Sequence, residues 1–389
     1  MVALSVDYVI VRMQNKEIQA QFKHTSAGYP MTTLKIDLRM LRFSGIGTYL
    51  VNLIPEIIKT NPDIHFYLVG KKDEIRCYDW ANNDNVTVEN CQVPIYSISE
   101  QFLLARKKPT DTDLFWVSHY NIPLLYSGKL LVTVHDVFHI AMPEYREGIH
   151  QRLYAKTLFT AVKYKADKII CVSEFTAGEL VRLTGVNPAK ITVIHNGVNR
   201  EWFEIEKCPH NKPYLLYVGN VKPYKNLVRL VEAFELLANK IPHDLMIVGK
   251  KEGFITNDRV VEKRAASLKQ RVYFTGYVDD ELLHQYFVHA DALVFPSLYE
   301  GFGLPPLEAM ACGCPVIVSN AASIPEVCGD AAIYCNPYSV EDIADKIEQL
   351  LADKSLQEEM RLKGIERAKA FSWDKTVQQT CAVIETLIK

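Results

Sequence analysis

Short apolar runs alternate with amphipathic helical segments along most of this chain, and no other feature constrains its fold as strongly. The runs at 34–38, 65–70 and 129–136 have the length of buried strands, and the segment 48–61 has helical periodicity despite Pro55. Buried strands joined by helices form parallel sheets that are covered by helices on both faces. We therefore predict an α/β fold built on parallel sheets.

The alternation is interrupted once, by the polar, proline-containing segment 204–213, and restarts with a strand-like run at 214–220. A chain of 389 residues also exceeds what a single hydrophobic core usually organises. Each half begins with an apolar strand followed by a glycine-containing turn, which predicts two doubly wound, Rossmann-like domains facing each other. Ligands in such sheets bind beyond the carboxyl ends of the strands, so the site is expected in the cleft between the domains.

Charge and cysteine content exclude several classes of protein. The formal net charge of -2 gives no electrostatic reason to expect nucleic acid as a partner. The nine cysteines show neither a CxxC pair nor zinc-finger spacing, as expected of free thiols in a reducing cytoplasm. No apolar stretch is long enough for a membrane span, and no signal-peptide pattern opens the chain, so we expect it to be neither spanning nor secreted.

Two local basic clusters leave two interpretations open. One is the run 106–108, and the other comprises Lys156, Lys163, Lys165 and Lys168. They fit a solvated helix face, and they also fit peripheral contact with an anionic membrane surface.

The stretch SLYEGFGLPPLEAMACGCP, residues 297–315, is the most informative candidate site. Glu300 and Glu308 are separated by seven residues, and Pro305 and Pro306 between them suit the first turn of a helix. Glu300 should therefore lie in a loop and Glu308 one turn inside a helix. The free amides at 302–304 would then point out of the helix N-terminus, where they can bind phosphate. A phosphate between two carboxylates suggests a nucleotide sugar. The alternative is that Glu308 is a solvent-facing or helix-N-terminal acid stabilised by the macrodipole and that Glu300 is an ordinary loop residue.

Three further segments follow predicted strands and hold candidate site residues. Gly45 and Gly47, in SGIGT, can bring backbone amides against a diphosphate or can simply form a tight turn. His135 can bond a sugar hydroxyl or be satisfied by local backbone, with Asp136 orienting it or capping a turn; His119 is a weaker candidate for the acceptor side. Lys225, before the helix expected from about residue 226, can neutralise a leaving diphosphate or be a surface lysine.

The string EGFGLPPLEAMACGCPVIVS resembles the retaining glycosyltransferases of the GT-B fold, in particular family 4, whose hallmark is two glutamates separated by seven residues. SGIGTYLVNL is similar to the glycine loop of that family, and YVGNVKPYKN is similar to its phosphate-binding loop. The resemblance implies catalytic roles for Glu300, Lys225 and His135. It assigns donor-sugar hydroxyls to Glu300, the ribose to Glu308, and the diphosphate to Lys225 and the glycine loop.

The same resemblance implies that the loop 274–283 reads the nucleobase. The donor-binding residues that it implies are Gly45, Gly47, Asn220, Lys225, Tyr277, Val278, Glu300, Phe302, Gly303, Leu304 and Glu308. Asn220 and Tyr224 stand where arginines often occur, which leaves Lys225 as the single cation of the pattern and Lys222 as a candidate to compensate for the missing arginines. The implied domains are an N-terminal extension (1–30), an acceptor-side domain (31–205), a donor-side domain (206–372) and a C-terminal helix that crosses back to the first domain (373–389).

These features predict a retaining transferase that moves a hexose from a nucleotide diphosphate sugar to an acceptor hydroxyl, with no metal and no further cofactor. The chain resembles bacterial mannosyltransferases of surface-polysaccharide assembly, which implies GDP-mannose as the first candidate donor, ahead of UDP-sugars and other GDP-sugars. It also implies a saccharide or lipid-linked oligosaccharide as acceptor, in the cytoplasm. The alternatives are a nucleotide-sugar epimerase of the same fold and a non-catalytic nucleotide-sugar-binding subunit.

Overall fold

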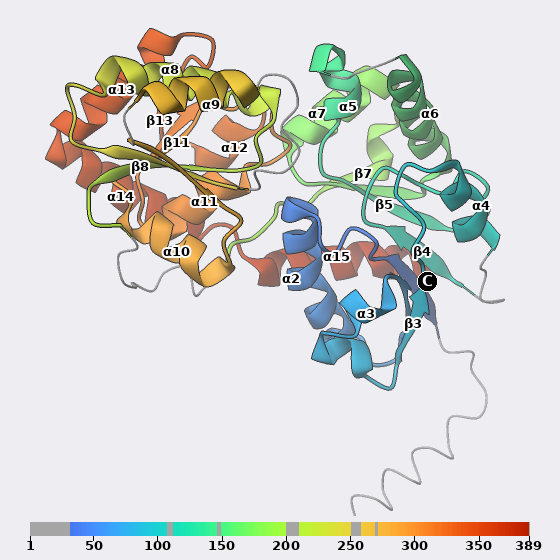
Figure 1. The fold of residues 1–389 in the computed structure, drawn as a ribbon. Helices are drawn as coiled ribbons and strands as arrows, with labels where there is room; N and C mark the ends of the chain where they lie inside the picture. Colours follow the sequence, from blue (N-terminus) through green and yellow to red (C-terminus); the bar gives the residue numbers. More distant parts are fainter. Residues whose placement is uncertain are drawn as a thin grey trace, which may run out of the picture.

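The computed structural model of the chain describes residues 32–106, 112–145, 149–199, 210–249, 258–268 and 271–388. It consists of two lobes, each with a central sheet and helices on both sides of it (Figure 1). The predicted extension 1–30 and most of the interrupting segment 204–213 lie outside the described residues.

The first lobe contains a seven-stranded parallel sheet with the strand order β3-β2-β1-β4-β5-β6-β7. Its strands are β1 (Thr33–Asp37), β2 (His65–Gly70), β3 (Val86–Asn90), β4 (Leu114–Val117), β5 (Leu130–Val134), β6 (Lys168–Cys171) and β7 (Ile191–Val193). Its helices are α2 (Ser44–Thr60), α3 (Lys72–Ile75), α4 (Ile98–Arg106), α5 (Phe138–Ala141), α6 (Ile149–Lys165) and α7 (Glu174–Thr184).

The second lobe contains a six-stranded parallel sheet with the order β10-β9-β8-β11-β12-β13. Its strands are β8 (Tyr214–Val218), β9 (Asp244–Val248), β10 (Val272–Gly276), β11 (Ala292–Phe295), β12 (Val316–Ser319) and β13 (Ile333–Cys335). Its helices are α8 (Leu227–Leu237), α9 (Asp258–Ser267), α10 (Asp280–His289), α11 (Leu304–Ala311), α12 (Ile324–Cys328), α13 (Val340–Ala352) and α14 (Lys354–Ala368).

Both sheets reverse their strand order beside the first strand of the lobe. The reversal lies between β1 and β4 in one sheet and between β8 and β11 in the other, and β1, β4, β8 and β11 are all fully buried. In open α/β sheets such a reversal opens a crevice at the carboxyl ends of the strands. This topology confirms the predicted fold and places the crevices after residues 37, 117, 218 and 295.

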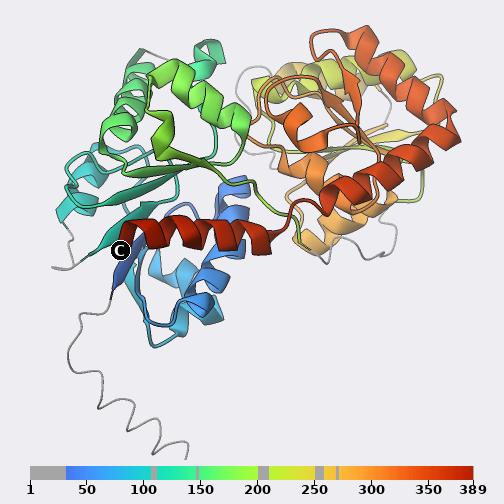
Figure 2. The same ribbon diagram turned by 180° about the vertical axis from the view of Figure 1, so that it is seen from behind.

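The chain crosses between the lobes a second time near its end. Helix α15 (Trp373–Ile388) packs against α2 and lies across the first lobe (Figure 2). The two described crossing segments touch, because the Val198 N–H donates to the Phe371 carbonyl at 3.3 Å. A Cβ built at Gly197 would lie 2.2 Å from the Trp373 nitrogen, so only glycine permits this approach.

Two details of the fold bear on the sequence interpretation. Helix α2 begins at Ser44, so SGIGT forms the first turn of the helix and not the separate glycine turn that we expected. Of the helices that the structure describes, none is both long and apolar enough to cross a membrane.

Candidate functional site

Two neighbouring strands of the second lobe deliver the central charged pair of the site. Lys225 ends a short 3-10 helix (Pro223–Lys225) that follows β8, and Glu300 follows β11. The Lys225 Nζ lies 2.5 Å from the Glu300 Oε1, and their side chains are only 16% and 12% exposed. The sequence predicted both residues as site residues, and the structure brings them into direct contact.

Buried polar side chains hold the loop that carries Glu300. The Ser323 hydroxyl donates to the carbonyls of Glu300 (2.9 Å) and Phe302 (2.8 Å). On the other side, the Leu298 N–H donates to the Tyr224 carbonyl at 2.7 Å, which ties the loop to the segment of Lys225. Hydrogen bonds within the second lobe therefore hold the loop in place. The sequence did not single out Ser323, because an isolated serine carries no local pattern.

The N-terminus of α11 faces the same space. Gly303, which immediately precedes the helix, has a φ of +113°, a conformation that strongly favours glycine, and Pro305 and Pro306 lie in the first turn as predicted. Within the described part of the chain, no hydrogen bond is made by the amides of Phe302, Gly303 or Leu304. Free amides at a helix start provide donors and a positive partial charge for an anion.

Glu308 lies one turn inside α11, as predicted, and differs electrostatically from Glu300. Burial, and secondarily the charge of Asp280 at the start of α10, raise the pKa of Glu308 to about 7. Tyr277, which is 73% exposed, and Val278 come just before Asp279, the N-cap residue of α10. The predicted nucleobase loop therefore adjoins the glutamate that was assigned to the ribose.

The first lobe contacts the loop that carries Glu300 at Gly301. A Cβ built at Gly301 would lie 1.8 Å from the carbonyl oxygen of His135 and 2.8 Å from the Cβ of Asp136. The Gly301 carbonyl also accepts hydrogen bonds from the hydroxyls of Ser173 (2.6 Å) and Thr176 (3.0 Å). The Glu300 loop and the strand end at His135 are consequently in van der Waals contact.

His135 is neutral in this environment. Its Nε2 donates to the Ser118 carbonyl at 3.1 Å, and its ring packs edge-on against Tyr49. Burial lowers the pKa of His135 to about 4, although the bond to Ser118 acts in the opposite direction. Because Nε2 carries the proton, Nδ1 is the acceptor that can receive a hydroxyl. Asp136 caps the turn that follows, because its Oδ1 accepts the Phe138 N–H at 3.0 Å at the start of α5.

The two glycines of α2 have different surroundings. A Cβ at Gly45 would lie 3.6 Å from the Leu304 side chain, so Gly45 faces the start of α11. A Cβ at Gly47 would lie 2.5 Å from the Leu41 carbonyl oxygen, so Gly47 is needed for local backbone packing. Asn220 is half-buried between β8 and the 3-10 helix of Lys225.

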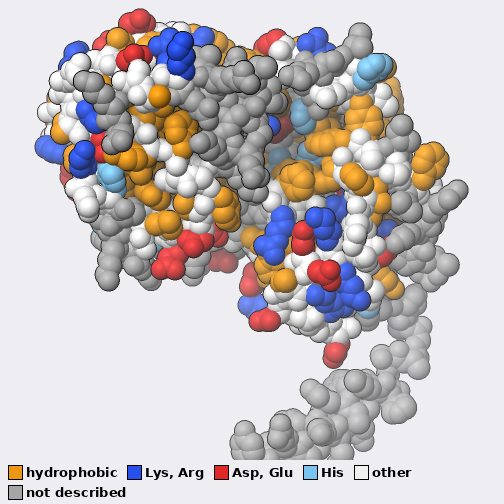
Figure 3. Space-filling view, viewed as in Figure 1, with side chains coloured by type: hydrophobic (Ala, Val, Ile, Leu, Met, Phe, Trp, Pro, Cys, Tyr) orange, Lys and Arg blue, Asp and Glu red, His pale blue; other side chains and the backbone are white. Residues whose placement is uncertain are grey.

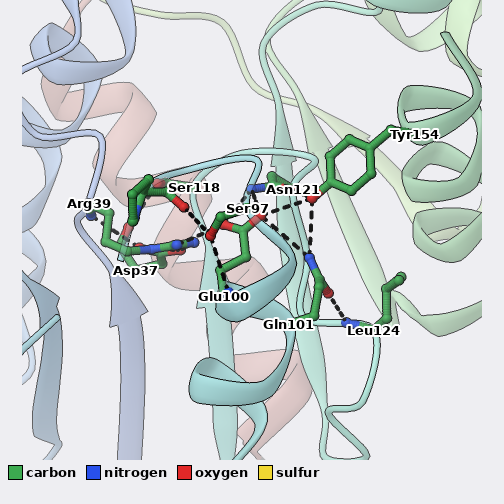
Figure 4. A network of polar contacts seen from close by, with 10 residues as sticks. Asp37, Arg39, Ser97, Glu100, Gln101, Ser118, Asn121, Leu124 and Tyr154 are labelled. Atoms are coloured by element: carbon green, nitrogen blue, oxygen red, sulfur yellow. Dashed lines mark hydrogen bonds and ion pairs between the residues drawn. The ribbon is translucent and has the colours of Figure 1, made fainter. Parts of the chain in front are cut away.

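A buried polar network that the sequence did not indicate lies at the carboxyl edge of the first sheet (Figure 4). The Arg39 guanidinium binds the carboxylate of Asp37 (2.7 Å) and that of Glu100 (2.8 Å), which is fully buried. The Glu100 carboxylate also accepts from Asn121 at 2.8 Å and from the Tyr154 hydroxyl at 2.9 Å. The network fixes α4 and the residues after β4 beside the cleft.

An aromatic cluster lies next to this network. Tyr96, which is 41% exposed and has a φ of +66°, has its ring centroid 6.0–6.4 Å from four rings, those of His119, Tyr120, His139 and Tyr154. Figure 3 shows hydrophobic and histidine side chains gathered on this face of the first lobe. Burial, followed by the charges of His135, His139 and Arg39, holds the pKa of His119 well below its usual value.

The structure offers no converging set of metal ligands among the residues it describes, in the sense of three or more His, Cys, Asp or Glu side chains. The polar groups that converge in the cleft are the Lys225–Glu300 pair, the α11 amides and the imidazole of His135.

Comparison with known proteins matches both lobes to families. Residues 43–202 match the model described as Glycosyltransferase Family 4, and residues 198–369 match Glycosyl transferases group 1. The O-antigen chain mannosyltransferase B of Escherichia coli is 32% identical over 268 residues, which cover 65% of this chain and 69% of that protein.

Two further similarities concern length and fold. The serotype-specific mannosyltransferase WbdA of Escherichia coli is 30% identical over 275 residues, and the match covers 67% of this chain but only 32% of WbdA. Sucrose-phosphate synthase from Thermosynechococcus elongatus superposes with a TM-score of 0.76 at 21% identity, over 92% of this chain and 99% of that one.

Proposed function

Since this chain belongs to glycosyltransferase family 4 and has the GT-B fold, we propose that it is a retaining hexosyltransferase that uses a nucleotide diphosphate sugar. The observation that carries the proposal is the Lys225–Glu300 pair, with a nitrogen–oxygen distance of 2.5 Å, beside the free amides that start α11. A cation and helix amides suit a diphosphate, and a carboxylate suits sugar hydroxyls.

In this proposal the second lobe binds the donor. Lys225 and the amides of Phe302, Gly303 and Leu304 bind the diphosphate, and Gly45 approaches it from the opposite side. Glu300 binds donor-sugar hydroxyls and Glu308 binds the ribose. Tyr277 and Val278 contact the base, and Asn220 lines the same pocket. We further propose the domain bounds 31–205 and 206–372, with 373–389 as the returning helix.

The chemistry follows from stabilising the leaving group. The bond between the anomeric carbon and the phosphate oxygen breaks with its electrons on the oxygen, and the positive groups around Lys225 stabilise that charge without a metal. The acceptor oxygen then attacks from the face that the diphosphate leaves, and its proton passes to the departing phosphate oxygen. His135, being neutral, accepts a sugar hydroxyl at Nδ1 and transfers no proton.

We propose that the acceptor is a saccharide bound against the aromatic cluster around Tyr96. Aromatic rings with polar edges suit the mixed apolar and hydroxyl faces of a sugar ring. The mannosyltransferases similar to this chain support mannose as the transferred sugar and GDP-mannose as the first donor to test. A lipid-linked oligosaccharide on the cytoplasmic membrane face is one acceptor of this class, and the exposed Lys156 of α6 could contact that surface.

The test combines a ligand screen with a matched pair of variants. Nucleoside diphosphates and their sugars are screened by thermal shift, because a ligand that binds only the native state raises the melting temperature. Lys225→Ala should lower kcat for the best donor by about 100-fold, a typical loss for one group that stabilises transition-state charge. Lys222→Ala, an exposed lysine in the same segment, should leave kcat unchanged.

The proposal fails if none of these compounds stabilises the protein, or if Lys222→Ala and Lys225→Ala behave alike. A trapped glycosyl-enzyme adduct in an intact mass spectrum would contradict the same-face mechanism.

A further inference from the structure

The side chain of Glu326 crosses from the second lobe to the first. Glu326 belongs to α12, but its carboxylate accepts hydrogen bonds from the N–H groups of Glu174 (2.8 Å) and Phe175 (3.0 Å), the first two residues of α7. It also accepts from the Nε2 of His195 at 2.7 Å. All three donors belong to the first lobe.

The contact suits an ionised carboxylate. Helix N-termini present unpaired amides and a positive partial charge, so an acid that bridges two of them is stabilised. Burial of the Glu326 carboxyl acts to raise its pKa, but the bonds from His195 and from the two amides outweigh burial, so the pKa lies below its usual value. The carboxylate therefore holds α12 on α7 at neutral pH.

The same end of α7 also holds the loop of Glu300. Ser173 caps α7 by accepting the Thr176 N–H at 3.0 Å, and the hydroxyls of both residues donate to the Gly301 carbonyl. On the other side of α12, Arg367 donates to the carbonyls of Glu326 (2.6 Å) and Val327 (2.8 Å). Helix α12 is thus anchored in its own lobe, and its one acidic side chain reaches the helix on which the Glu300 loop rests.

We infer that Glu326 is a positioning residue for glycosyl transfer: by seating α12 on the N-terminus of α7, it fixes the Glu300 loop against His135 and plays no part in nucleotide binding. The inference rests on the proposed function. The nucleotide-binding groups named above all belong to the second lobe except Gly45, so loss of this contact should open the cleft and leave most of the nucleotide site intact.

The experiment compares Glu326→Gln with Glu179→Gln in the full chain. Glu179 lies on α7 and accepts hydrogen bonds from Arg182 of the same helix at 2.7 and 2.8 Å, and no described residue of the second lobe hydrogen-bonds it, so this variant makes the same charge change without removing a hydrogen bond between the lobes. Three quantities are measured: kcat with GDP-mannose, the Kd of GDP by calorimetry, and the radius of gyration of the ligand-free protein by small-angle scattering.

Glu326→Gln should lower kcat by at least about tenfold, within the usual range of a coupling between two sites, and change the Kd of GDP by less than about threefold. Its radius of gyration should exceed that of the parent, while Glu179→Gln should match the parent in all three measurements. If Glu326→Gln does not fold, Glu326→Asp, which keeps the charge but shortens the reach, should show the same pattern to a smaller degree.

Two outcomes overturn the inference. One is an unchanged kcat, whatever the radius of gyration; the other is a parallel loss of GDP affinity, which would make Glu326 part of the nucleotide site. If the parent neither binds GDP nor turns over GDP-mannose, the proposed donor is wrong, and the inference is then judged by scattering alone. A radius of gyration of Glu326→Gln equal to that of the parent refutes the inference, and a larger one supports it.

Discussion

Replacing Gly301 with alanine should disable transfer and spare nucleotide binding. The added Cβ would lie 1.8 Å from the carbonyl oxygen of His135, far inside van der Waals contact. The opposing atom is backbone at the end of a buried strand, so no side-chain rotation can relieve the clash. The two lobes must separate at this point, because the Glu300 loop is tied to its own lobe by Ser323.

The magnitude follows from the cost of overpacking. One added methyl group in a close-packed region costs about 1–3 kcal/mol. If that energy is lost only when the lobes are closed, the closed population relative to the open one falls by about 5- to 150-fold. We expect kcat to fall by this factor, because Glu300 and His135 approach each other only in the closed arrangement.

The assay is steady-state transfer together with calorimetric measurement of nucleotide affinity. The matched control is Gly178→Ala on α7, where a Cβ would meet nothing within 4 Å, so that variant should keep the parental kcat. The Kd of the nucleotide should stay within about threefold of the parent in both variants, as expected of an interaction made only in the transition state. A parental kcat in Gly301→Ala would refute the reasoning.

Three further predictions concern ionisable side chains. The pKa of Glu308 is about 7, so nucleotide affinity measured by calorimetry should increase as the pH rises from about 6 to about 8, and Glu308→Gln should lose this dependence. A carboxyl with a raised pKa destabilises the fold when it ionises, so in thermal denaturation at about pH 8 without ligand Glu308→Gln should melt at a higher temperature than the parent. His135→Gln should lower kcat without changing the shape of the pH–rate profile between about pH 5.5 and 8, because the pKa of His135 is about 4; an inflection near pH 6.5 that disappears in the variant would contradict this. Glu100→Ala should reduce the free energy of unfolding in urea by about 3–5 kcal/mol, because it leaves the Arg39 charge buried and only partly compensated. The control Glu56→Ala removes an exposed partner of Lys59 and should reduce the free energy of unfolding by less than about 1 kcal/mol. Equal losses in the two variants would show that the network is not electrostatically coupled.

Elements with a strong periodic pattern could be predicted from the sequence, and those without one could not. The fully buried strands β1 and β8 were found from their apolar runs, whereas β3 was missed because it lies at the sheet edge and most of its side chains are not buried. Helix α14 was missed for a related reason. Its buried positions are Met360, Gly364 and Ala368, and two of these carry almost no apolar side chain to mark the buried face.

The candidate site shows the same division. The loop position of Glu300 and the helix position of Glu308 follow from glycine and proline preferences within a few residues, so they could be predicted and are confirmed. The pairing of Arg39 with Glu100 spans 61 positions and involves residue types that usually lie on the surface. Only the tertiary fold brings them together, and no local pattern could have indicated it.

The proposed site draws its groups from both lobes, so a substitution at Gly301, where the lobes touch, should have a large effect on transfer. Lys225, Glu300, Glu308 and the α11 amides all come from the second lobe, and such a lobe by itself could bind a nucleotide sugar without transferring it. His135 and the aromatic cluster come from the first lobe. The position that joins the two lobes is Gly301, which has no side chain; the His135 carbonyl lies against its Cα, and its own carbonyl accepts from two hydroxyls. In the proposed mechanism, any larger residue at this position would separate the donor from the acceptor before it weakened either binding site. Transfer should therefore be more sensitive to substitutions along this contact than to comparable substitutions in the nucleotide pocket.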